Sequence, residues 1–299
     1  STISTISARR EVILCCGAIN TPRLMQISGI GDPDHLEKIG VPVVKPLPAV
    51  GANLKDHYTS RFTVQVKGAV SINDIANGPR VLMEGAKWLI KKPSIVGMGV
   101  VLGASFCKSD PLVATPDLVI TFTPGSFKEG FLGRLDDIPG MTIGAWQLRP
   151  NSVGYVKAIS KNIFDPPTVQ PNYFQDERDR KVLVSGLKII RQLLKTPPLC
   201  NYVEQELTPG SSVQSDSDFL EYARNQGLAG YHYCGTCRMG DSKEESSVVD
   251  GALRVHGIEG LRIVDASVMP NIVSGNTNAA TMMIAERGAE FILKDRLSS

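Results

Sequence analysis

Long apolar runs are missing from this chain, and cysteine is scarce. No stretch approaches the roughly 18 consecutive apolar residues that cross a bilayer, so the sequence predicts no transmembrane segment. Six cysteines in 299 residues are too few for a disulfide-dense secreted scaffold. The chain has no Asn-x-Ser/Thr acceptor, and its opening STISTISARR lacks the apolar core of a signal peptide. These absences favour an intracellular protein over a secreted one.

An excess of charge of one sign is missing too. The 32 basic and 30 acidic residues leave a formal net charge of +2, which indicates neither a nucleic-acid partner nor a polybasic membrane surface. The hydrophobic fraction of 42% and the charged fraction of 21% are ordinary for a globular protein. The length suits one large domain or two ordinary ones.

The pattern of apolar residues divides the chain into two textures. Residues 1–58 and 229–299 combine short apolar strands with helices, whereas residues 59–228 carry longer alternating strands. The sequence therefore predicts an α/β fold with an α+β insert: a nucleotide-binding core in two pieces, 1–58 and 229–299, and a sheet-rich domain, 59–228, between them. So few parallel strands cannot bury both faces of a sheet, so this core needs a partner. No Gly-x-Gly-x-x-Gly turn is present to hold a dinucleotide.

Local patterns predict the individual elements. A buried strand over 10–16 ends at Gly17, and another over 261–264 ends at Asp265. The turn-like cluster 149–152 predicts a hairpin that joins strands 141–147 and 154–159. Helices are expected at 80–91, 175–194, 215–225 and 277–294.

Five segments resemble motifs of the glucose-methanol-choline (GMC) oxidoreductase family. GAINTPRLMQISGIG, at 17–31, resembles its second signature, with a small pair, Thr-Pro, two aliphatic residues and Ser-Gly-aliphatic-Gly. LPAVGANLKDH, at 47–57, resembles the Pro-x-Val-Gly-x-Asn-Leu-x-Asp-His segment. YHYCGTCRMG, at 231–240, resembles the His-Pro-x-Gly-Thr-x-x-Met-Gly block, and 248–270 and 274–287 resemble the closing blocks. The resemblance covers essentially the whole chain and is nearest to the choline dehydrogenase-like branch.

The resemblance implies a flavoprotein of which this chain is the C-terminal half. It implies part of a FAD-binding Rossmann-like domain together with a sheet-rich substrate domain. The family's N-terminal half, with the Gly-rich FAD fingerprint, is missing. We therefore expect FAD binding to need that half, as a separate or cleaved chain. A smaller departure is Tyr233, where the family usually has proline.

The resemblance also implies a reaction, the oxidation of an alcohol to an aldehyde with hydride transfer to N5 of FAD. The base of the family falls on His232, and its second active-site position, His or Asn, falls on Asn276. Histidine suits a base because its pKa lies near neutral pH. Asn276 does not titrate, so its expected role is to orient the substrate oxygen. Without the motif, a lone histidine is more often structural than catalytic.

Cofactor contacts are expected at the end of a strand and at the start of the last helix. Asp265, followed by Ala266, falls where the family holds the FAD diphosphate region; the alternative is a turn-forming aspartate. The N–H groups of the helix that begins near Thr277, directly after Asn276, would stabilise negative charge on reduced flavin. The alternative there is an ordinary core helix.

The other candidate residues have plainer interpretations. Cys234 and Cys237 have the spacing of a zinc or redox pair, but no second pair completes four ligands, so we expect no metal. His57 is expected to pack or to lie at the surface rather than to line the entrance of the active site. The pair 91–92, two lysines, is expected to be a solvated helix face.

Two other functions stay open on the sequence alone. Hydroxynitrile lyases resemble the family and use flavin structurally, but they tend to have histidine where this chain has Asn276. A non-catalytic fragment or subunit that binds no flavin is supported by the missing fingerprint alone. The colour of the purified protein separates the three functions. An alcohol-oxidising enzyme is yellow and is bleached by an alcohol, a hydroxynitrile lyase stays yellow, and a subunit without flavin is colourless.

Overall fold

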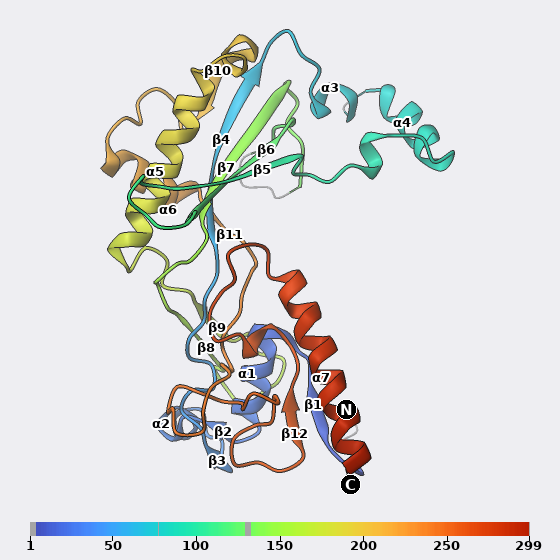
Figure 1. Cartoon of the computed structure of the whole chain (residues 1–299), viewed down its shortest axis with the longest axis vertical. Helices are drawn as coiled ribbons and strands as arrows, with labels where there is room; N and C mark the ends of the chain where they lie inside the picture. The colour runs from blue at the N-terminus through green and yellow to red at the C-terminus, as the bar shows by residue number, and fades with distance from the viewer. Residues whose placement is uncertain (1–3, 77, 129–132, 299) are drawn as a thin grey trace. The chain divides into compact units, whose positions relative to one another are not determined.

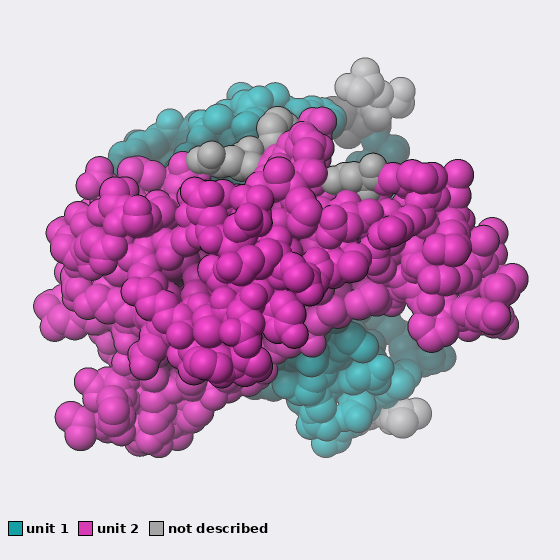
Figure 2. Space-filling view, turned by 90° about the horizontal axis from the view of Figure 1, so that it is seen from above, with its two compact units in different colours: residues 1–57, 149–176, 230–299 teal, residues 58–148, 177–229 magenta. Residues whose placement is uncertain are grey.

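The computed structural model describes residues 4–76, 78–128 and 133–298 of the chain. Its backbone contacts form two compact units, which Figure 2 colours separately. Unit 1 comprises residues 1–57, 149–176 and 230–299, and unit 2 comprises residues 58–148 and 177–229. The elements mix helices and strands in both units, which confirms the predicted α/β character (Figure 1).

Unit 1 is built around a parallel pair of strands. Strand β1 (Val12–Leu14) lies beside β12 (Leu261–Ile263), with Val12 opposite Leu261. Each strand leads towards a helix, α1 (Gly17–Ile27) after β1 and α7 (Asn278–Ser298) after β12. The remaining elements of unit 1 are β2 (Ile30–Gly31), α2 (Pro33–Lys38), β3 (Lys45–Pro46), β8 (Tyr155–Lys157), β9 (Thr168–Gln170) and the short helix η3 (Ala266–Val268).

Helix α1 explains why two distant motifs occur together. Pro22 has no N–H, so it cannot donate to the carbonyl of Ala18 one turn earlier. The hydroxyl of Thr236 donates to that carbonyl instead, at 2.6 Å. Gly17 begins the helix at φ +80°, a left-handed conformation that favours glycine. The motif of residues 17–31 and the motif of residues 231–240 therefore complete one another in space.

The core of unit 1 joins α1 and α7 to the loops between them. Met25 and Ile284 contribute one residue from each helix, and Ile263 contributes one from β12. Burial of an aliphatic side chain of this size is worth about 1.5–3 kcal/mol relative to its exposure. The other buried members of this cluster are Ile30, Ala49, Val50, Cys234, Cys237, Val248, Val249, Leu253, Val255, Val268, Met269 and Ile272.

Residues 149–176 pack with unit 1, whereas the sequence placed them in the inserted domain. The buried amide of Gln26 draws them in: its Nε2 donates to the carbonyl of Val156 at 3.0 Å and to that of Val50 at 3.1 Å. Its Oε1 accepts the N–H of Ala158 at 2.7 Å. A polar side chain in α1 thereby satisfies backbone groups that would otherwise be buried without partners.

The predicted hairpin across residues 149–152 is wrong. Strand β7 (Gly140–Gln147) pairs with strands of unit 2, whereas β8 pairs with β9 in unit 1. Nearly every residue of β7 is buried, which suits the centre of a sheet rather than one arm of an exposed hairpin. The turn-like residues therefore mark a crossing from one unit to the other.

Unit 2 contains an antiparallel sheet of six strands within the described residues. Its path runs β10 (Val203–Thr208), β4 (Tyr58–Val66), β7, β6 (Leu118–Thr123) and β5 (Gly103–Cys107), and β11 (Leu228–Ala229) also pairs with β4. Helices α5 (Glu177–Leu194) and α6 (Asp216–Gln226) cover one face (Figure 1). The other elements of unit 2 are α3 (Ile72–Ala76), α4 (Arg80–Leu89), η1 (Ile95–Gly97) and η2 (Leu199–Tyr202).

Two features fix α5 on this sheet. A Cβ at Gly186 would lie 2.8 Å from a methyl carbon of Leu118, so glycine lets the helix approach β6 closely. The guanidinium of Arg191 lies 5.4 Å from the ring centre of Phe62 and 4.8 Å from that of Phe219, and it pairs with Glu206. An arginine held between two rings and a carboxylate stabilises this packing by cation–π attraction and charge pairing.

Replacement of Gln26 should destabilise unit 1. We expect Gln26→Ala to lower the free energy of unfolding by roughly 2–4 kcal/mol, because it leaves three buried backbone groups without a partner. Gln192→Ala, at an exposed position of α5, is the matched control. Chemical denaturation of both variants measures the difference, and equal unfolding midpoints would contradict this role of Gln26.

Candidate active site

The backbone of His232 is held beside the segment that contains Asp56 and His57. The N–H of His232 donates to Oδ1 of Asp56 at 2.7 Å, and the N–H of Gly230 donates to the carbonyl of His57 at 2.6 Å. A Cβ at Gly230 would lie 2.8 Å from that carbonyl oxygen, so only glycine fits there. Tyr231, between them, adopts φ +56°, which is uncommon for a residue with a side chain. These contacts fix the backbone position of His232.

The imidazole of His232 is contacted on both ring nitrogens. Its Nδ1 lies 2.9 Å from Nδ1 of His57, and its Nε2 lies 3.0 Å from Nδ2 of Asn276. The amide nitrogen of Asn276 is a donor, so Nε2 of His232 accepts. In the neutral ring the proton then resides on Nδ1, which donates to Nδ1 of His57. The structure thus brings His232 and Asn276 together, with the lone pair of His232 directed towards Asn276.

His57 was missed as a site residue in the sequence. Its side chain is 1% exposed, so it does pack in the interior, but it packs edge-on against His232, with the ring centres 5.1 Å apart. The available signal was its place at the end of the GMC-like segment 47–57. Nothing local in the sequence shows that this segment meets residue 232.

Burial shifts the pKa of Asp56 and the pKa of His232. It raises the pKa of Asp56 to about 6, because the ionised carboxylate loses water. It lowers the pKa of His232 below its ordinary value, because the imidazolium loses water in the same way. At neutral pH His232 is therefore neutral, with a lone pair on Nε2.

One tyrosine contacts the carboxylate of Asp56 directly. The hydroxyl of Tyr173 donates to Oδ2 of Asp56, and it also forms a hydrogen bond with Tyr233. The rings of Tyr231 and Tyr233 meet edge to face, with centres 6.3 Å apart. Tyr233, which replaces the usual proline, thus extends a chain of phenols from Asp56. Tyr173 was also missed in the sequence, because no motif marks it.

The predicted cofactor residues lie at the carboxyl end of β12 and at the start of α7. Asp265 is 6% exposed, and its Oδ2 accepts from the N–H of Gly17 at 3.0 Å and from the hydroxyl of Thr21 at 2.6 Å. Its Oδ1 accepts the N–H of Ser267 at 2.8 Å. This carboxylate therefore fixes the turn between β1 and α1.

Ala266 and Thr277 hold backbone positions around the same region. The carbonyl of Ala266 accepts the N–H of Gly235 at 3.2 Å, which ties the end of β12 to the segment 231–240. Thr277 is buried, and its carbonyl accepts the N–H of Thr281 at 2.9 Å at the start of α7. Asn276, directly before it, is the residue of this group that contacts His232.

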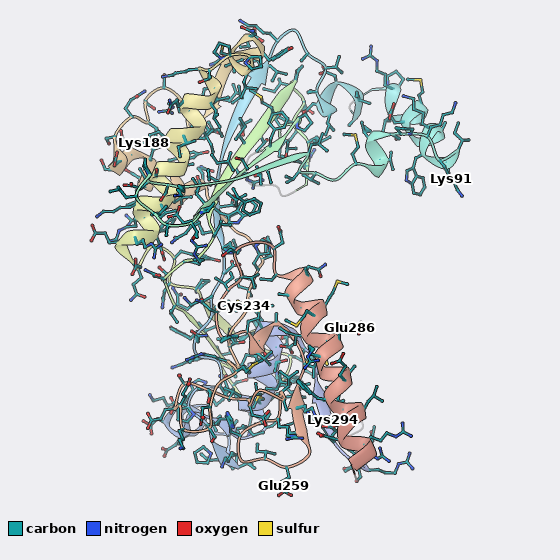
Figure 3. The ribbon with its side chains drawn as sticks, viewed as in Figure 1. Lys91, Lys188, Cys234, Glu259, Glu286 and Lys294 are labelled. Carbon is teal, nitrogen blue, oxygen red and sulfur yellow. The ribbon has the colours of Figure 1, made fainter. Side chains whose placement is uncertain are left out.

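Cys234 and Cys237 are buried thiols of the core (Cys234 is labelled in Figure 3). Burial raises the pKa of Cys234 to about 12 and raises that of Cys237 as well, so neither is a thiolate at neutral pH. Among the described residues, no group of three or more His, Cys, Asp or Glu side chains could hold a metal ion. In the same part of the chain, no helix is both long and apolar enough to cross a membrane.

Solved structures share this fold. A formate oxidase of Aspergillus oryzae RIB40, studied for FAD modification, matches 97% of this chain and 55% of its own at a TM-score of 0.88 and 26% identity. Pyridoxine 4-oxidase from Mesorbium loti matches 94% of this chain and 50% of its own at a TM-score of 0.78 and 27% identity. The chain thus shares its fold with these two oxidases, the first of which is described together with FAD.

Sequence comparisons identify the family. Models described as GMC oxidoreductase match residues 1–59 and 150–285. The chain is 35% identical to oxygen-dependent choline dehydrogenase 1 of Chromohalobacter salexigens, and 37% identical to the alcohol dehydrogenase [acceptor] of Pseudomonas putida. Each match covers 95% of this chain and 51% of the relative, so the chain spans about half the length of these curated relatives. The chain belongs to the GMC oxidoreductase family, whose members are FAD-dependent.

The raised pKa of Asp56 makes stability depend on pH. Its folded pKa of about 6 lies above the ordinary 3.8, so the folded state holds a proton that the unfolded state releases between about pH 4 and 6. Stability of the native protein therefore falls as pH rises through this window, by up to about 3 kcal/mol for a shift of about two units. Asp56→Asn carries no charge and should lack this loss, so its stability relative to the native protein should increase from pH 4 to pH 7.

Chemical denaturation at both pH values tests this. Asp34→Asn, at an exposed position in α2, is the matched control. If the difference in stability between Asp56→Asn and the native protein is the same at pH 4 and pH 7, the raised pKa is wrong.

Proposed function

We propose that this chain carries the active site of a FAD-dependent enzyme that oxidises an alcohol to an aldehyde. The observation that carries the proposal is the convergence of Nε2 of His232 and Nδ2 of Asn276, 3.0 Å apart. One atom accepts a proton and the other donates a hydrogen bond, and an alcohol oxygen needs both. The names of the relatives, choline and alcohol dehydrogenases, support the same class of substrate.

His232 is the proposed base. Its neutral ring presents a lone pair at Nε2, which would accept the proton of the substrate hydroxyl. As the C–H bond loses its hydride and the carbonyl forms, that proton remains on Nε2. The Nδ1–H of the ring stays bonded to His57, so the ring does not rotate while it changes charge.

Asn276 is the proposed orienting group. Without substrate its Nδ2 donates to His232; with an alcohol between them it would donate to the substrate oxygen instead. Such a donor stabilises the negative charge that develops on the oxygen as the proton leaves. Since an amide does not titrate near neutral pH, this contribution would not depend on pH.

The residues at this site fit a flavin. Bound FAD would supply the acceptor for the hydride. The first N–H groups of α7, which spans 21 residues, have no partner within the helix, and its N-terminus carries partial positive charge. Asn276 and Thr277 place this N-terminus beside His232. Asp265 would act indirectly by holding the turn before α1, at the carboxyl end of a parallel strand, where nucleotides bind. Ala266 would act indirectly by holding Gly235 of the segment 231–240.

The proposed partner is the other half of the FAD-binding domain. The exposed fraction is 47% for Val12 and 40% for Ile13, although strands of a parallel sheet are normally covered on both faces. Met282 and Met283 of α7 are also exposed. Further strands and helices beside β1 and α7, on the same chain or on another, would cover these side chains and complete the sheet.

Removal of the base should abolish reduction of the flavin. We expect His232→Ala to slow reduction by an alcohol by about 10²–10⁴-fold while FAD stays bound, because only proton transfer is lost. Anaerobic stopped-flow absorbance measures the rate, and the flavin spectrum measures occupancy. His35→Gln, on α2, is the control and should behave as the native enzyme.

The same experiment separates the other functions. Normal reduction in His232→Ala would remove His232 from the role of base. A native protein that holds FAD but is reduced by no alcohol would favour a lyase that uses flavin structurally. A native protein without flavin would favour a non-catalytic subunit.

His57 is the proposed positioning residue for His232. Its Nδ1 accepts from Nδ1 of His232, and this bond strengthens when the base becomes imidazolium. A group that accepts this proton keeps the lone pair on Nε2, where the substrate would lie. Because Nδ1 of His57 meets the imidazole of the base, the effect of His57 should appear in the titration of His232.

Two substitutions at position 57 separate positioning from packing. His57→Phe fills space but accepts no hydrogen bond, so we expect reduction to slow by roughly tenfold or more. The acid limb of the pH profile should also move to lower pH, because the imidazolium of His232 becomes less stable. His57→Gln retains an acceptor and should recover most of the rate. A slow His57→Phe with an unmoved acid limb would mean that His57 only fills space.

A further inference from the structure

Helix α4 of unit 2 exposes a regular apolar stripe. Leu82, Met83, Ala86, Leu89 and Ile90 follow the spacing of one helix face, and all are exposed. The exposed fraction reaches 76% for Leu82 and 75% for Leu89. We call these five residues the α4 face.

The acidic side chain of α4, Glu84, is turned inward. Glu84 is 6% exposed, and its carboxylate pairs with Lys87 at 2.5 Å and accepts the N–H of Ile95 at 3.0 Å. The hydroxyl of Ser94 donates to the carbonyl of Glu84 at 2.7 Å. The helix therefore buries Glu84 against Ser94 and η1 and exposes the α4 face, whereas an ordinary surface helix exposes its charged residues and buries its apolar ones. A contiguous exposed apolar surface of this kind marks an interaction site.

Positive charge borders the α4 face at both ends. Arg80 precedes it, and Lys91 and Lys92 follow it; all three are exposed. Figure 3 labels Lys91 at the end of this helix, which stands to one side of the sheet of unit 2 (Figure 1). Between residues 78 and 108 the only acidic residue is Glu84, which is already paired. This stretch of the sequence thus contains no further carboxylate beside these cations.

The neighbouring segment continues the apolar surface. Trp88 is 53% exposed, and Trp88, Ile95 and Met98 line a hollow of about 880 Å³ beside the helix. Tryptophan is enriched where proteins meet the headgroup layer of a bilayer, since its ring has an apolar body and a polar N–H. Lysines at such an edge extend their charged ends towards lipid phosphates.

We propose that the α4 face docks on an anionic membrane surface. In this arrangement the apolar α4 face would insert among acyl chains, and the cations at its border would meet the anionic headgroups. A second copy of the chain fits less well, because a symmetric contact would place the cations of one border near those of the other. With ten residues, α4 lies along a membrane rather than across it. Lys91 and Lys92 then contact lipid phosphates, beyond the solvated role expected from the sequence.

Vesicle flotation of the intact flavin-loaded protein tests the proposal. We expect binding to vesicles of 70% phosphatidylcholine and 30% phosphatidylglycerol, and at least tenfold weaker binding to pure phosphatidylcholine or in 0.5 M salt. The double variant Leu82→Gln, Leu89→Gln should bind at least tenfold less. The control Leu112→Gln, Phe164→Gln, at apolar positions that are exposed elsewhere, should bind as the native protein. Lys91→Gln, Lys92→Gln should lose the preference for anionic vesicles.

Far-ultraviolet circular dichroism checks that each variant is folded, and this check does not depend on whether the protein oxidises an alcohol. A failure of the proposed oxidation would therefore leave the flotation result interpretable. Absence of flotation, or equal flotation of the Leu82→Gln, Leu89→Gln variant, overturns the membrane proposal. Sedimentation without lipid tests whether a second copy of the chain or another polypeptide occupies the α4 face. A native dimer that this variant converts to monomer, or a second polypeptide that it releases, would assign the face to a protein partner instead.

Discussion

The buried carboxylate of Asp56 is the constraint on which the site depends. It accepts the backbone N–H of His232 across 176 positions of sequence and the hydroxyl of Tyr173 across 117. Three stretches of unit 1 that are far apart in the chain therefore meet at one side chain. A buried acceptor with strong donors is a rigid joint, because loss of either bond leaves a polar group without water. His57 follows Asp56 directly, so the joint that places the base also places the ring that contacts it.

A second buried carboxylate does the same for the cofactor side. Asp265 fastens the end of β12 to the beginning of α1, while Thr236 supplies the donor that Pro22 leaves out. The GMC-like motifs are thus hydrogen-bonded to one another. Residues 17–31 contact residues 231–240, and both segments contact the end of strand β12 near Asp265. Thr236 and Asp265 each satisfy a backbone group of another motif, the carbonyl of Ala18 and the N–H of Gly17.

Much of this arrangement follows from the sequence, and the exceptions share one cause. Strands β1 and β12 and helices α5, α6 and α7 lie close to their predicted bounds, because apolar periodicity is a local property. His232 and Asn276 were found through motifs, and the structure places them 3.0 Å apart. The failures are the hairpin at 149–152, the place of residues 149–176 and the contact of His57 with His232. All three depend on which distant segment supplies a partner, as Gln26 does for Val156, and no local pattern contains that information.

Burial shifts the pKa of both His232 and Asp56, and acidification makes each of them less favourable for the proposed reaction. Burial keeps His232 neutral at rest, which is the form that can accept a proton. Burial also keeps Asp56 protonated up to about pH 6, above which its carboxylate is negative beside the backbone of His232. A negative charge there favours the imidazolium that forms when an alcohol loses its proton. Acidification therefore removes both the base and the charge that stabilises its product. In this arrangement a single physical cause, the exclusion of water from both groups, sets both the strength of the base and the lower pH limit of the proposed reaction.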